Sequence, residues 1–348
     1  MIIHQTMLQK ELAKLPNVLD FKRAVVHREI EDSKEIINQV RRLEAGVAGE
    51  NLLVQKLKEF GKTDWTIIRN LRLKDFSTFE MDLVLLTRSC VYLFEVKNYT
   101  GSFEFNQGNS YFNGIELNSN IIQQTRNAFV NLKNICSEYS RNIRIKGILV
   151  FIGENNRVSI QSDTGDIRVL KLTDLHAFIR EITEEENLNR FPTFDIEGLL
   201  AHLETFEMTN NYLPVPLTAE EIELARGGIS CSRCLSYDVT ISRNYIKCSC
   251  GLHEPREEAM VRTICEYGML TYDRDLTKGE VFKFLDGNAS EKYLIKILQQ
   301  HFETVNKNRY TYYENYQLPY NLIREHFYIE KPVIYYNRRG FPEVYLLN

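Results

Sequence analysis

The sequence EMDLVLL occupies residues 80–86 and, after the short link TRSC, the sequence VYLFEVKNY occupies residues 91–99. Both runs are rich in β-branched and aromatic residues, which is typical of two strands joined in a β-hairpin. With the turn centred between Arg88 and Ser89, Asp82 faces Glu95 across the hairpin. Side chains alternate along a strand, so Lys97 emerges on the same face as Glu95. The sequence therefore predicts two acids and a lysine on one face.

A divalent cation is the simplest reason for acids in such apolar strands. Buried carboxylates are costly unless they are paired or hold a cation, and carboxylate oxygens are typical ligands of hard divalent ions. The alternative is an exposed sheet face with an ordinary Glu95–Lys97 pair. The additional Asp82 and the apolar surroundings make this alternative weaker.

With these motifs in view, the chain resembles the nuclease-related domain (NERD) family of the PD-(D/E)xK nuclease-like superfamily. The resemblance covers roughly residues 40–155 and rests on the combination of four motifs, AGVAGE at 45–50, EMD at 80–82, EVKNYTG at 95–101 and NIIQQ at 120–124. The family usually has Asn-Pro-x-x-Gln in the fourth motif, where this chain has Ile121. A proline there stiffens the start of a helix, so the departure concerns the helix cap and not the chemistry.

The resemblance implies a restriction-endonuclease-like fold and a metal-dependent nuclease that hydrolyses phosphodiester bonds, in DNA ahead of RNA. It implies that Asp82 and Glu95 hold Mg²⁺ or Mn²⁺, with the carbonyl of Val96 as an extra ligand. Two other functions remain open, a nucleic-acid-binding protein that does not cleave and a scaffold that recruits a protein partner.

Three further roles come from the resemblance. Lys97 orients or activates the attacking water, Glu50 completes the metal shell or helps to deprotonate that water, and Gln124 positions backbone or solvent. Taken without the resemblance, Glu50 and Gln124 also fit ordinary solvent-facing positions on helices.

The composition limits the classes of partner. Hydrophobic residues make up 43% of the 348 residues, which is ample for a core, and the net charge of −4 provides no global attraction to nucleic acid. A local basic patch over residues 126–146 is one candidate contact, and a solvated helix face is the alternative. No apolar run reaches the roughly 20 residues that span a bilayer, and the start lacks the features of a signal peptide. The few cysteines favour a reducing, cytoplasmic location without membrane partners.

The order of elements predicts an α/β protein of several parts. The mixed sheet flanked by helices includes a helix over 45–60, in which Gly46 and Gly49 allow close approach to the sheet, a helix over about 120–137 and a central strand near 143–152. The predicted parts are a helical N-terminal extension (1–44), the nuclease-like domain (45–210), a linker with a short helix (211–227), a zinc-ribbon-like module (228–254) and a C-terminal α+β domain (255–348).

Four cysteines in the fourth part form C-x2-C and C-x-C pairs on either side of a β-like stretch. Zinc in structural sites takes four soft ligands in a tetrahedron. We therefore expect structural Zn²⁺ at these cysteines. The C-x-C pair is tighter than usual, so His253 is an alternative ligand for one position. The predicted ligands are Cys231, Cys234, Cys248 and Cys250.

The last part has two short helices around Asp286–Ala289, which fits a helix-turn-helix, with the tyrosine-rich segment 310–313 as a wing or strand. A winged-helix-like domain is therefore one interpretation. However, residues 221–348 contain equal numbers of basic and acidic side chains, whereas a phosphate-binding domain should be positive. A structural domain that binds a protein partner or forms a homodimer is at least as compatible with the sequence.

Overall fold

The computed structural model describes residues 1–6, 8–9, 15–154, 156–188, 191–208, 213–307, 310–315, 333–336 and 342–345. It divides into two compact units. Unit 1 contains Met1–Lys10 and Arg41–Asn211, and unit 2 contains Glu11–Val40 and Tyr212–Asn348. The predicted extension over 1–44 is therefore shared between the units. Its first element is a strand, β1 (Ile2–His4), and not a helix, because its backbone pairs with the strand that begins at Thr66.

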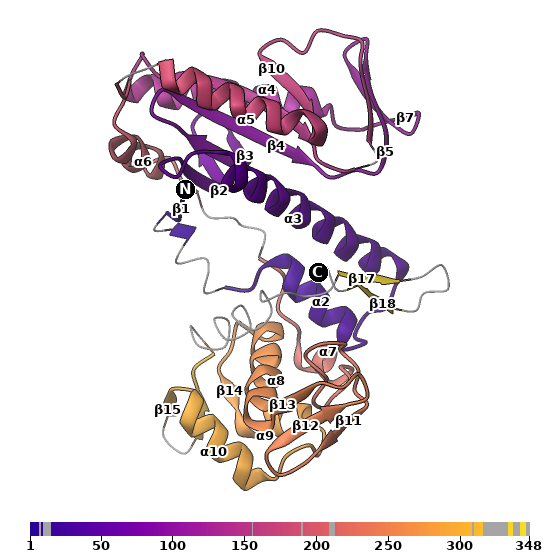
Figure 1. Cartoon of the computed structure of the whole chain (residues 1–348). Coiled ribbons are helices and arrows are strands. Elements are labelled where there is room, and N and C mark those ends of the chain that lie inside the picture. The colour runs from indigo at the N-terminus through magenta and orange to yellow at the C-terminus, as the bar shows by residue number, and fades with distance from the viewer. Residues whose placement is uncertain are drawn as a thin grey trace. The chain divides into compact units, whose positions relative to one another are not determined.

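Unit 1 is built around a mixed sheet of six strands in the order β1-β2-β3-β4-β8-β10 (Figure 1). β2, β3 and β4 are antiparallel neighbours, while β4, β8 and β10 run parallel. Strand β8 lies between β4 and β10, so the prediction of an interior strand is confirmed. The strand bounds are β2 Thr66–Lys74, β3 Thr78–Leu86, β4 Cys90–Lys97, β8 Arg144–Phe151 and β10 Ile167–Lys171.

Helices cover both faces of this sheet, which explains why its strands are apolar on both sides. Leu83 and Leu85 pack in one core with residues of α3 (Lys34–Phe60) and α5 (Leu172–Leu188). Val84 and Leu86 pack in the opposite core with residues of α4 (Ile121–Tyr139) and α6 (Ile196–Glu204). The predicted α/β class is thus present in the structure.

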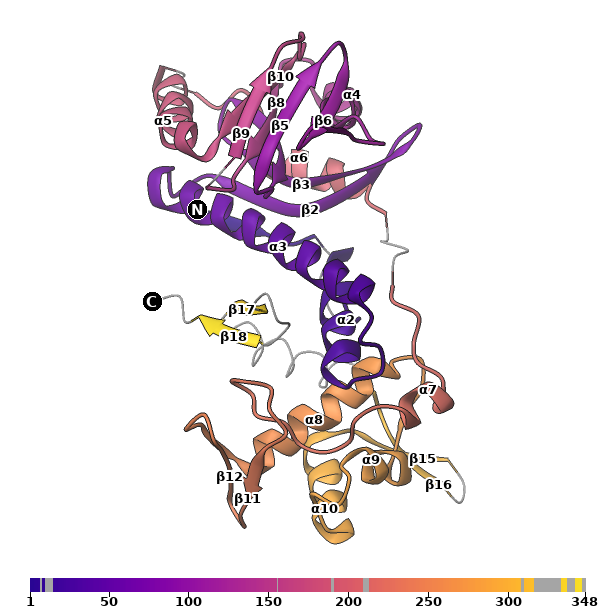
Figure 2. The same cartoon turned by 90° about the vertical axis from the view of Figure 1, so that its right-hand side faces the viewer.

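A second sheet of four strands extends the unit beyond β4, in the order β7-β6-β5-β9 (Figure 2). From the sequence we expect a meander of two strands after Gly101, at 102–105 and 110–112; these are β5 and β6, whereas β7 and β9 were not predicted. Phe103 and Phe105 of β5 pack with Phe151 at the end of β8, which joins the two sheets through one core. The bounds are β5 Gly101–Asn106, β6 Asn109–Phe112, β7 Ile115–Glu116 and β9 Asn156–Ile160.

Two helices differ from the prediction in length. The helix expected over 45–60 is the second half of α3, which begins already at Lys34. The sequence also predicts a helix from about Leu172 to Ile182; this is α5, which continues to Leu188, whereas α6 was not predicted. Helix α4 begins where expected, because the Asn120 side chain caps it by accepting a hydrogen bond from the backbone N–H of Gln123.

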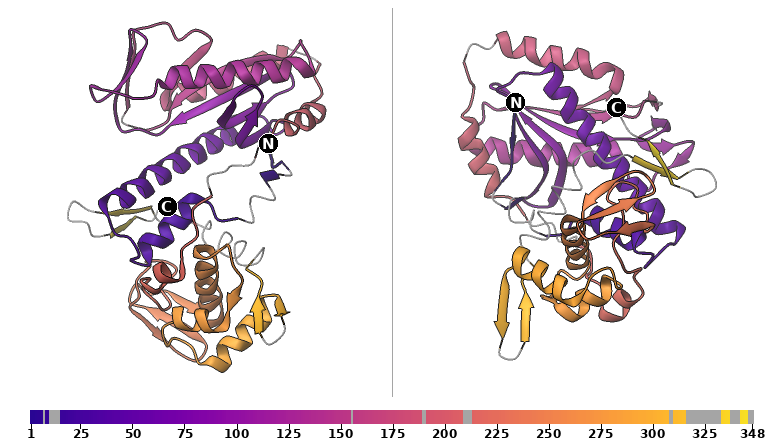
Figure 3. Two further views of the ribbon diagram at one scale, coloured as in Figure 1. Left: turned by 180° about the vertical axis from the view of Figure 1, so that it is seen from behind. Right: turned by 60° about the horizontal axis from the view of Figure 1, so that its bottom comes forward.

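Unit 2 is organised around helix α8 (Arg256–Leu270), which is buried on nearly all sides. Helix α2 (Val18–His27) packs against it, together with two small three-stranded sheets and the helices α9 (Lys278–Phe284) and α10 (Glu291–His301) (Figures 2 and 3). The first sheet contains β11 (Val239–Ile241), β12 (Tyr245–Cys248) and β13 (His253–Pro255).

The second small sheet has the order β14-β16-β15, so β16, which comes last in the sequence, lies between the other two strands. The tyrosine-rich segment predicted as a wing or strand is β16. The short helix expected in the linker 211–227, near 218–226, is α7 and covers only Ala219–Glu223. The remaining bounds are β14 Leu276–Thr277, β15 Thr304–Lys307, β16 Tyr310–Tyr313, and the paired strands β17 Val333–Tyr336 and β18 Pro342–Tyr345. Within the described residues, no helix is long and apolar enough to cross a membrane.

Candidate active site

The hairpin β3–β4 brings Asp82, Glu95 and Lys97 together. Leu83 pairs with Phe94 and Leu85 with Tyr92, which is the predicted register. One oxygen of the Asp82 carboxylate accepts a 2.7 Å hydrogen bond from the backbone N–H of Val96, the residue after Glu95. The Lys97 ammonium group donates to Glu95 at a distance of 2.6 Å. The predicted cluster of two acids and a lysine therefore exists in the fold.

Burial disfavours the ionised forms of Asp82 and Glu95 more strongly than their hydrogen bonds and the charge of Lys97 favour them. Glu95 is only 4% exposed, and burial together with repulsion from Asp82 raises its pKa to about 7, although the nearby Lys97 opposes the shift. Burial also raises the pKa of Asp82, against the hydrogen bond from Val96 and the charge of Lys97. Lowering the cost of the ionised form requires further positive charge, which a divalent cation supplies.

Helix α3 adds Glu50 to the cluster by a close approach to the sheet. A Cβ atom on Gly49 would lie 2.9 Å from the Cβ of Asn98 and 3.0 Å from a methyl carbon of Ile152. The expected need for a small residue is confirmed at Gly49 and wrong at Gly46, where an added Cβ would meet nothing within 4 Å because Gly46 faces open space. The Asn98 side chain also donates to the Ala45 carbonyl at 2.8 Å.

Glu50 lies in the electrostatic field of the other acids. Burial raises its pKa, the negative charge of Asp82 adds to this increase, and Arg69 opposes it. The guanidinium group of Arg69, on β2, lies 3.2 Å from the Glu50 carboxylate. The site therefore holds three interacting carboxylates, from one helix and two strands.

Two further charged residues at the site were not predicted. Glu80 lies two residues before Asp82 on β3, and its charge raises the pKa of Glu95. Side chains two residues apart lie on the same face of a strand, so the alternation that was used to place Asp82 also places Glu80 on that face. Arg69 depends on the pairing of β2 with β3, where it lies opposite Leu83, and no local pattern indicates that register.

Gln124 differs from the other four predicted side chains. It is exposed in the first turn of α4. Within the described part of the chain, it makes no hydrogen bond to Glu50, Asp82, Glu95 or Lys97. The fold therefore joins four of the five predicted side chains directly. Val96 belongs to the same strand as Glu95, and its backbone N–H is taken by Asp82.

The basic residues of the span 126–146 come from different elements of the fold. Arg126 and Lys133 lie on helix α4, Arg141 in the turn that follows it, and the other two on strand β8. On β8, Arg144 and Lys146 both contact the carboxylate of Glu185, at 3.2 and 2.7 Å. Part of the positive charge in this span is therefore neutralised within the protein.

The four predicted zinc ligands converge in unit 2. The sulfur atoms of Cys231, Cys234, Cys248 and Cys250 all lie within 4.8 Å of one another. Hydrogen bonds from the Cys250 backbone and from neighbouring thiols outweigh the effect of burial and lower the pKa of Cys248 to about 7. His253 lies outside this group, exposed on β13 opposite Lys247. Four soft donors in one place match a structural zinc site.

Residues 45–152 match the family model described as NERD, nuclease-related domain. The matched segment begins within α3 and ends just after β8, so it includes Glu50, Asp82, Glu95 and Lys97. Comparisons with curated proteins and with solved structures gave no match.

Proposed function

We propose that residues 45–152 form a metal-dependent nuclease of the PD-(D/E)xK type that hydrolyses phosphodiester bonds, with DNA as the preferred substrate. The observation that carries this proposal is the cluster of Asp82, Glu95 and Glu50 beside Lys97, in which burial raises the pKa of each acid and the charge of Asp82 adds to the increase at Glu50 and Glu95. Such an excess of buried negative charge supports a divalent cation site. The match to the nuclease-related family supports a nucleic-acid substrate.

Asp82 and Glu95 would hold Mg²⁺ or Mn²⁺, with Glu50 and the Val96 carbonyl as further candidate ligands. When bound, the ion polarises the scissile phosphate and lowers the pKa of a coordinated water. The hydrogen bond from the backbone N–H of Val96 restrains the Asp82 carboxylate, which supports its role as a ligand.

Lys97 would act on the substrate side of the carboxylates. Its ammonium group is held by Glu95 at 2.6 Å and is partly buried, so it offers a fixed positive charge next to the metal ligands. This charge stabilises the negative charge that develops on the phosphate and orients the attacking water. For Glu50, we propose a share in the metal shell or the removal of a proton from that water. For Gln124, contact with substrate backbone or solvent remains the proposal.

Unit 2 would contain a zinc-ribbon-like module followed by a winged-helix-like domain. The four clustered sulfurs support Zn²⁺ as a structural ion that joins the two cysteine pairs. The order α8-β14-α9-α10-β15-β16, with β16 between β14 and β15, supports a winged-helix-like arrangement.

The test is cleavage of labelled single- and double-stranded DNA and RNA in the presence of Mg²⁺ or Mn²⁺. Wild type is compared with Glu95→Ala, Lys97→Ala and a reaction without divalent metal. Glu116→Ala, an exposed acid on β7 outside the cluster, is the matched control. Cleavage that is lost in the first three cases and retained in the control supports the nuclease.

A wild type that binds nucleic acid in a metal-dependent manner without cutting it would instead indicate a binding protein. The absence of both binding and cleavage would indicate the scaffold that recruits a protein partner. Each outcome is distinguished by measuring binding and cleavage on the same preparations.

A further inference from the structure

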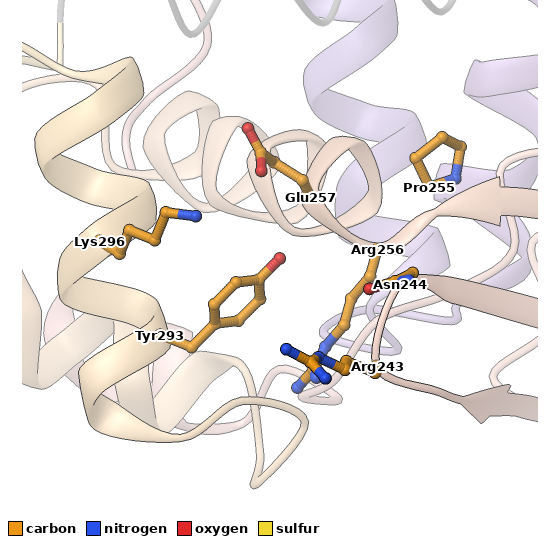
Figure 4. A pocket seen from close by; sticks show the side chains of 7 residues that line it. All are labelled: Arg243, Asn244, Pro255, Arg256, Glu257, Tyr293 and Lys296. Carbon is orange, nitrogen blue, oxygen red and sulfur yellow. The ribbon is translucent and has the colours of Figure 1, made fainter.

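A hollow of about 610 Å³ lies in unit 2 beside the cysteine-containing module (Figure 4). Three separate elements line it. Arg243 and Asn244 come from the turn between β11 and β12, Arg256 and Glu257 from the first turn of α8, and Tyr293 and Lys296 from α10. The hollow therefore depends on the tertiary arrangement of the module and the helices.

The lining has a local excess of positive charge, although the C-terminal half of the chain is balanced overall. Arg243, Arg256 and Lys296 contribute three cations, and Glu257 is the one acid in the lining. Glu257 is already engaged by α10, since its carboxylate contacts the ring of His301 at 2.7 Å and the amide of Gln300 at 3.0 Å. Within the described residues, Arg243 and Lys296 form no ion pair with an acid.

Arg256 is held in place from several sides. Its guanidinium group donates to the Asn288 carbonyl at 2.9 Å, and its backbone N–H donates to the Asn244 carbonyl at 2.8 Å. The guanidinium carbon lies 4.8 Å from the centre of the Tyr293 ring. Its Nε atom is buried and has no acceptor among the described residues. A cation that is held in place in this way is suited to an anionic ligand.

The combination of charge and aromatic surface fits nucleic acid. Phosphate groups bind to arginine and lysine side chains, and bases stack on aromatic rings that lie beside them. Figure 4 shows the Tyr293 ring extending into the hollow between the arginines and Lys296. An acidic peptide would use the cations but would have no need for the ring. The match of residues 45–152 to a nuclease-related domain also favours nucleic acid over a peptide.

We infer that this hollow binds the phosphodiester backbone of a nucleic-acid strand through Arg243, Arg256 and Lys296, with Tyr293 in contact with a base. The site lies within unit 2 and contains none of the residues of the candidate nuclease centre. It therefore adds a second nucleic-acid contact to the protein, and it does not require that unit 1 cleaves the strand.

The experiment measures the binding of short fluorescent oligonucleotides by anisotropy, with full-length protein that carries Asp82→Asn to prevent cleavage. The probes are single-stranded DNA, single-stranded RNA and duplex DNA of one sequence, so that the source of the phosphates is also identified. The variants Arg243→Ala and Lys296→Ala remove exposed cations from the lining. The matched control is Lys292→Ala, an exposed lysine on the same helix that does not line the hollow.

We expect each lining variant to weaken binding about tenfold, as for the loss of one charge-assisted contact. The slope of log affinity against log salt should become less steep by about one for each lost phosphate contact. The Lys292→Ala variant should stay within about twofold of its parent, since only long-range attraction is lost. Zinc content and far-UV circular dichroism confirm that each variant is folded.

Equal affinities for the lining variants and the Lys292 control would overturn the inference. A labelled oligoglutamate that binds more tightly than every oligonucleotide, and weakens with the same substitutions, would assign the hollow to an acidic peptide instead. Cleavage is measured in separate assays. If the protein proves not to cleave, a loss of affinity in the Arg243→Ala and Lys296→Ala variants would still support the binding site in unit 2.

Discussion

The carboxylate of Asp82 accepts a 2.7 Å hydrogen bond from the backbone N–H of Val96 across the β3–β4 hairpin. This bond fixes an acid beside Glu95, even though the negative charge of Asp82 raises the pKa of Glu95. A hairpin selected only for stability would gain from a neutral residue at either position. The arrangement supports the proposed cation site between the two acids.

The substitution Asp82→Asn tests whether Asp82 is a metal ligand or only an acid near the metal. We expect Asp82→Asn to reduce cleavage by at least about 100-fold, because an uncharged amide is a poor ligand for a hard cation. Glu80→Gln, two residues earlier on the same strand and exposed, should retain activity within about tenfold. The measurement is the initial rate of cleavage at saturating Mg²⁺. Equal losses in the two variants would show that Glu80 belongs to the metal shell.

The affinity for divalent metal should increase with pH. Burial and the charge of Asp82 raise the pKa of Glu95 from its ordinary value of 4.5 to about 7, so the metal-free folded protein keeps this proton between those values. A metal must displace it, and affinity should rise by up to about tenfold per pH unit across this range and then level off. Titration calorimetry with Mn²⁺ on the zinc-loaded protein measures this.

The same pKa shift has a consequence for stability without divalent metal. A raised pKa in the folded state means that the contribution of Glu95 is present below pH 4.5 and is lost as the pH rises through about 7. The variant Glu95→Gln should remove this part of the pH dependence of stability.

In the calorimetric titration of wild type with Mn²⁺, an affinity that does not change with pH would contradict the assignment of Glu95 as a ligand.

The two glycines of α3 should respond to alanine in opposite directions. Gly49→Ala places a methyl group against Asn98 and Ile152 and should destabilise unit 1 by about 1–3 kcal/mol through overpacking. Gly46→Ala faces open space and should stabilise the helix by up to about 1 kcal/mol. Urea unfolding followed by the fluorescence of Trp65, the single tryptophan, reports on unit 1. Stabilisation by Gly49→Ala would disprove the close contact of α3 with the sheet.

The cysteine cluster should bind one zinc ion without His253. Cys250→Ser should release zinc and unfold the module, because a structural zinc site contributes its binding energy to folding. His253→Ala should keep wild-type zinc content, since this side chain is exposed outside the cluster. Metal analysis of the purified proteins gives both stoichiometries. Loss of zinc from the His253→Ala variant would show that His253, and not one of the four cysteines, is the fourth ligand.

The N-terminal segment should be essential to unit 2 through a buried ion pair. Arg28 is fully buried and contacts Glu266 of α8 at 2.5 Å and the carbonyl of Gly228 at 2.7 Å. Arg28→Ala leaves a buried carboxylate without its partner and should destabilise unit 2 by about 3–5 kcal/mol. Hydrogen exchange of peptides from α8 measures this loss.

A matched control is Lys283→Ala, which removes an exposed pair with Glu223 and should change stability by less than about 1 kcal/mol. The positive charges of Arg28 and His27 hold the pKa of Glu266 below its usual range, despite burial. The resulting stability is present above the ordinary glutamate pKa and is lost as the pH falls below it. Similar protection of α8 in both variants would show that the pair is dispensable.

Local patterns were sufficient for much of unit 1. The apolar runs on either side of TRSC predicted the hairpin and its register, because strand alternation and a short turn leave few other pairings. The start of α4 was indicated by Asn120, whose side chain caps the helix. The short strand β1 was missed, since three residues carry no periodic signal and are stabilised only by pairing with β2.

By itself, the sequence determined the hairpin that presents Asp82, Glu95 and Lys97, and the four cysteines that meet in unit 2, since these depend on spacing along the chain. The resemblance also implied Glu50 at the site, but tertiary structure alone decided that Arg69 pairs with it, that Gln124 stays apart, and that residues 11–40 belong to unit 2. It also decided that Arg243, Arg256 and Lys296 line one hollow. These arrangements join residues that are distant in sequence, and they form only when packing of the core fixes helices against sheets.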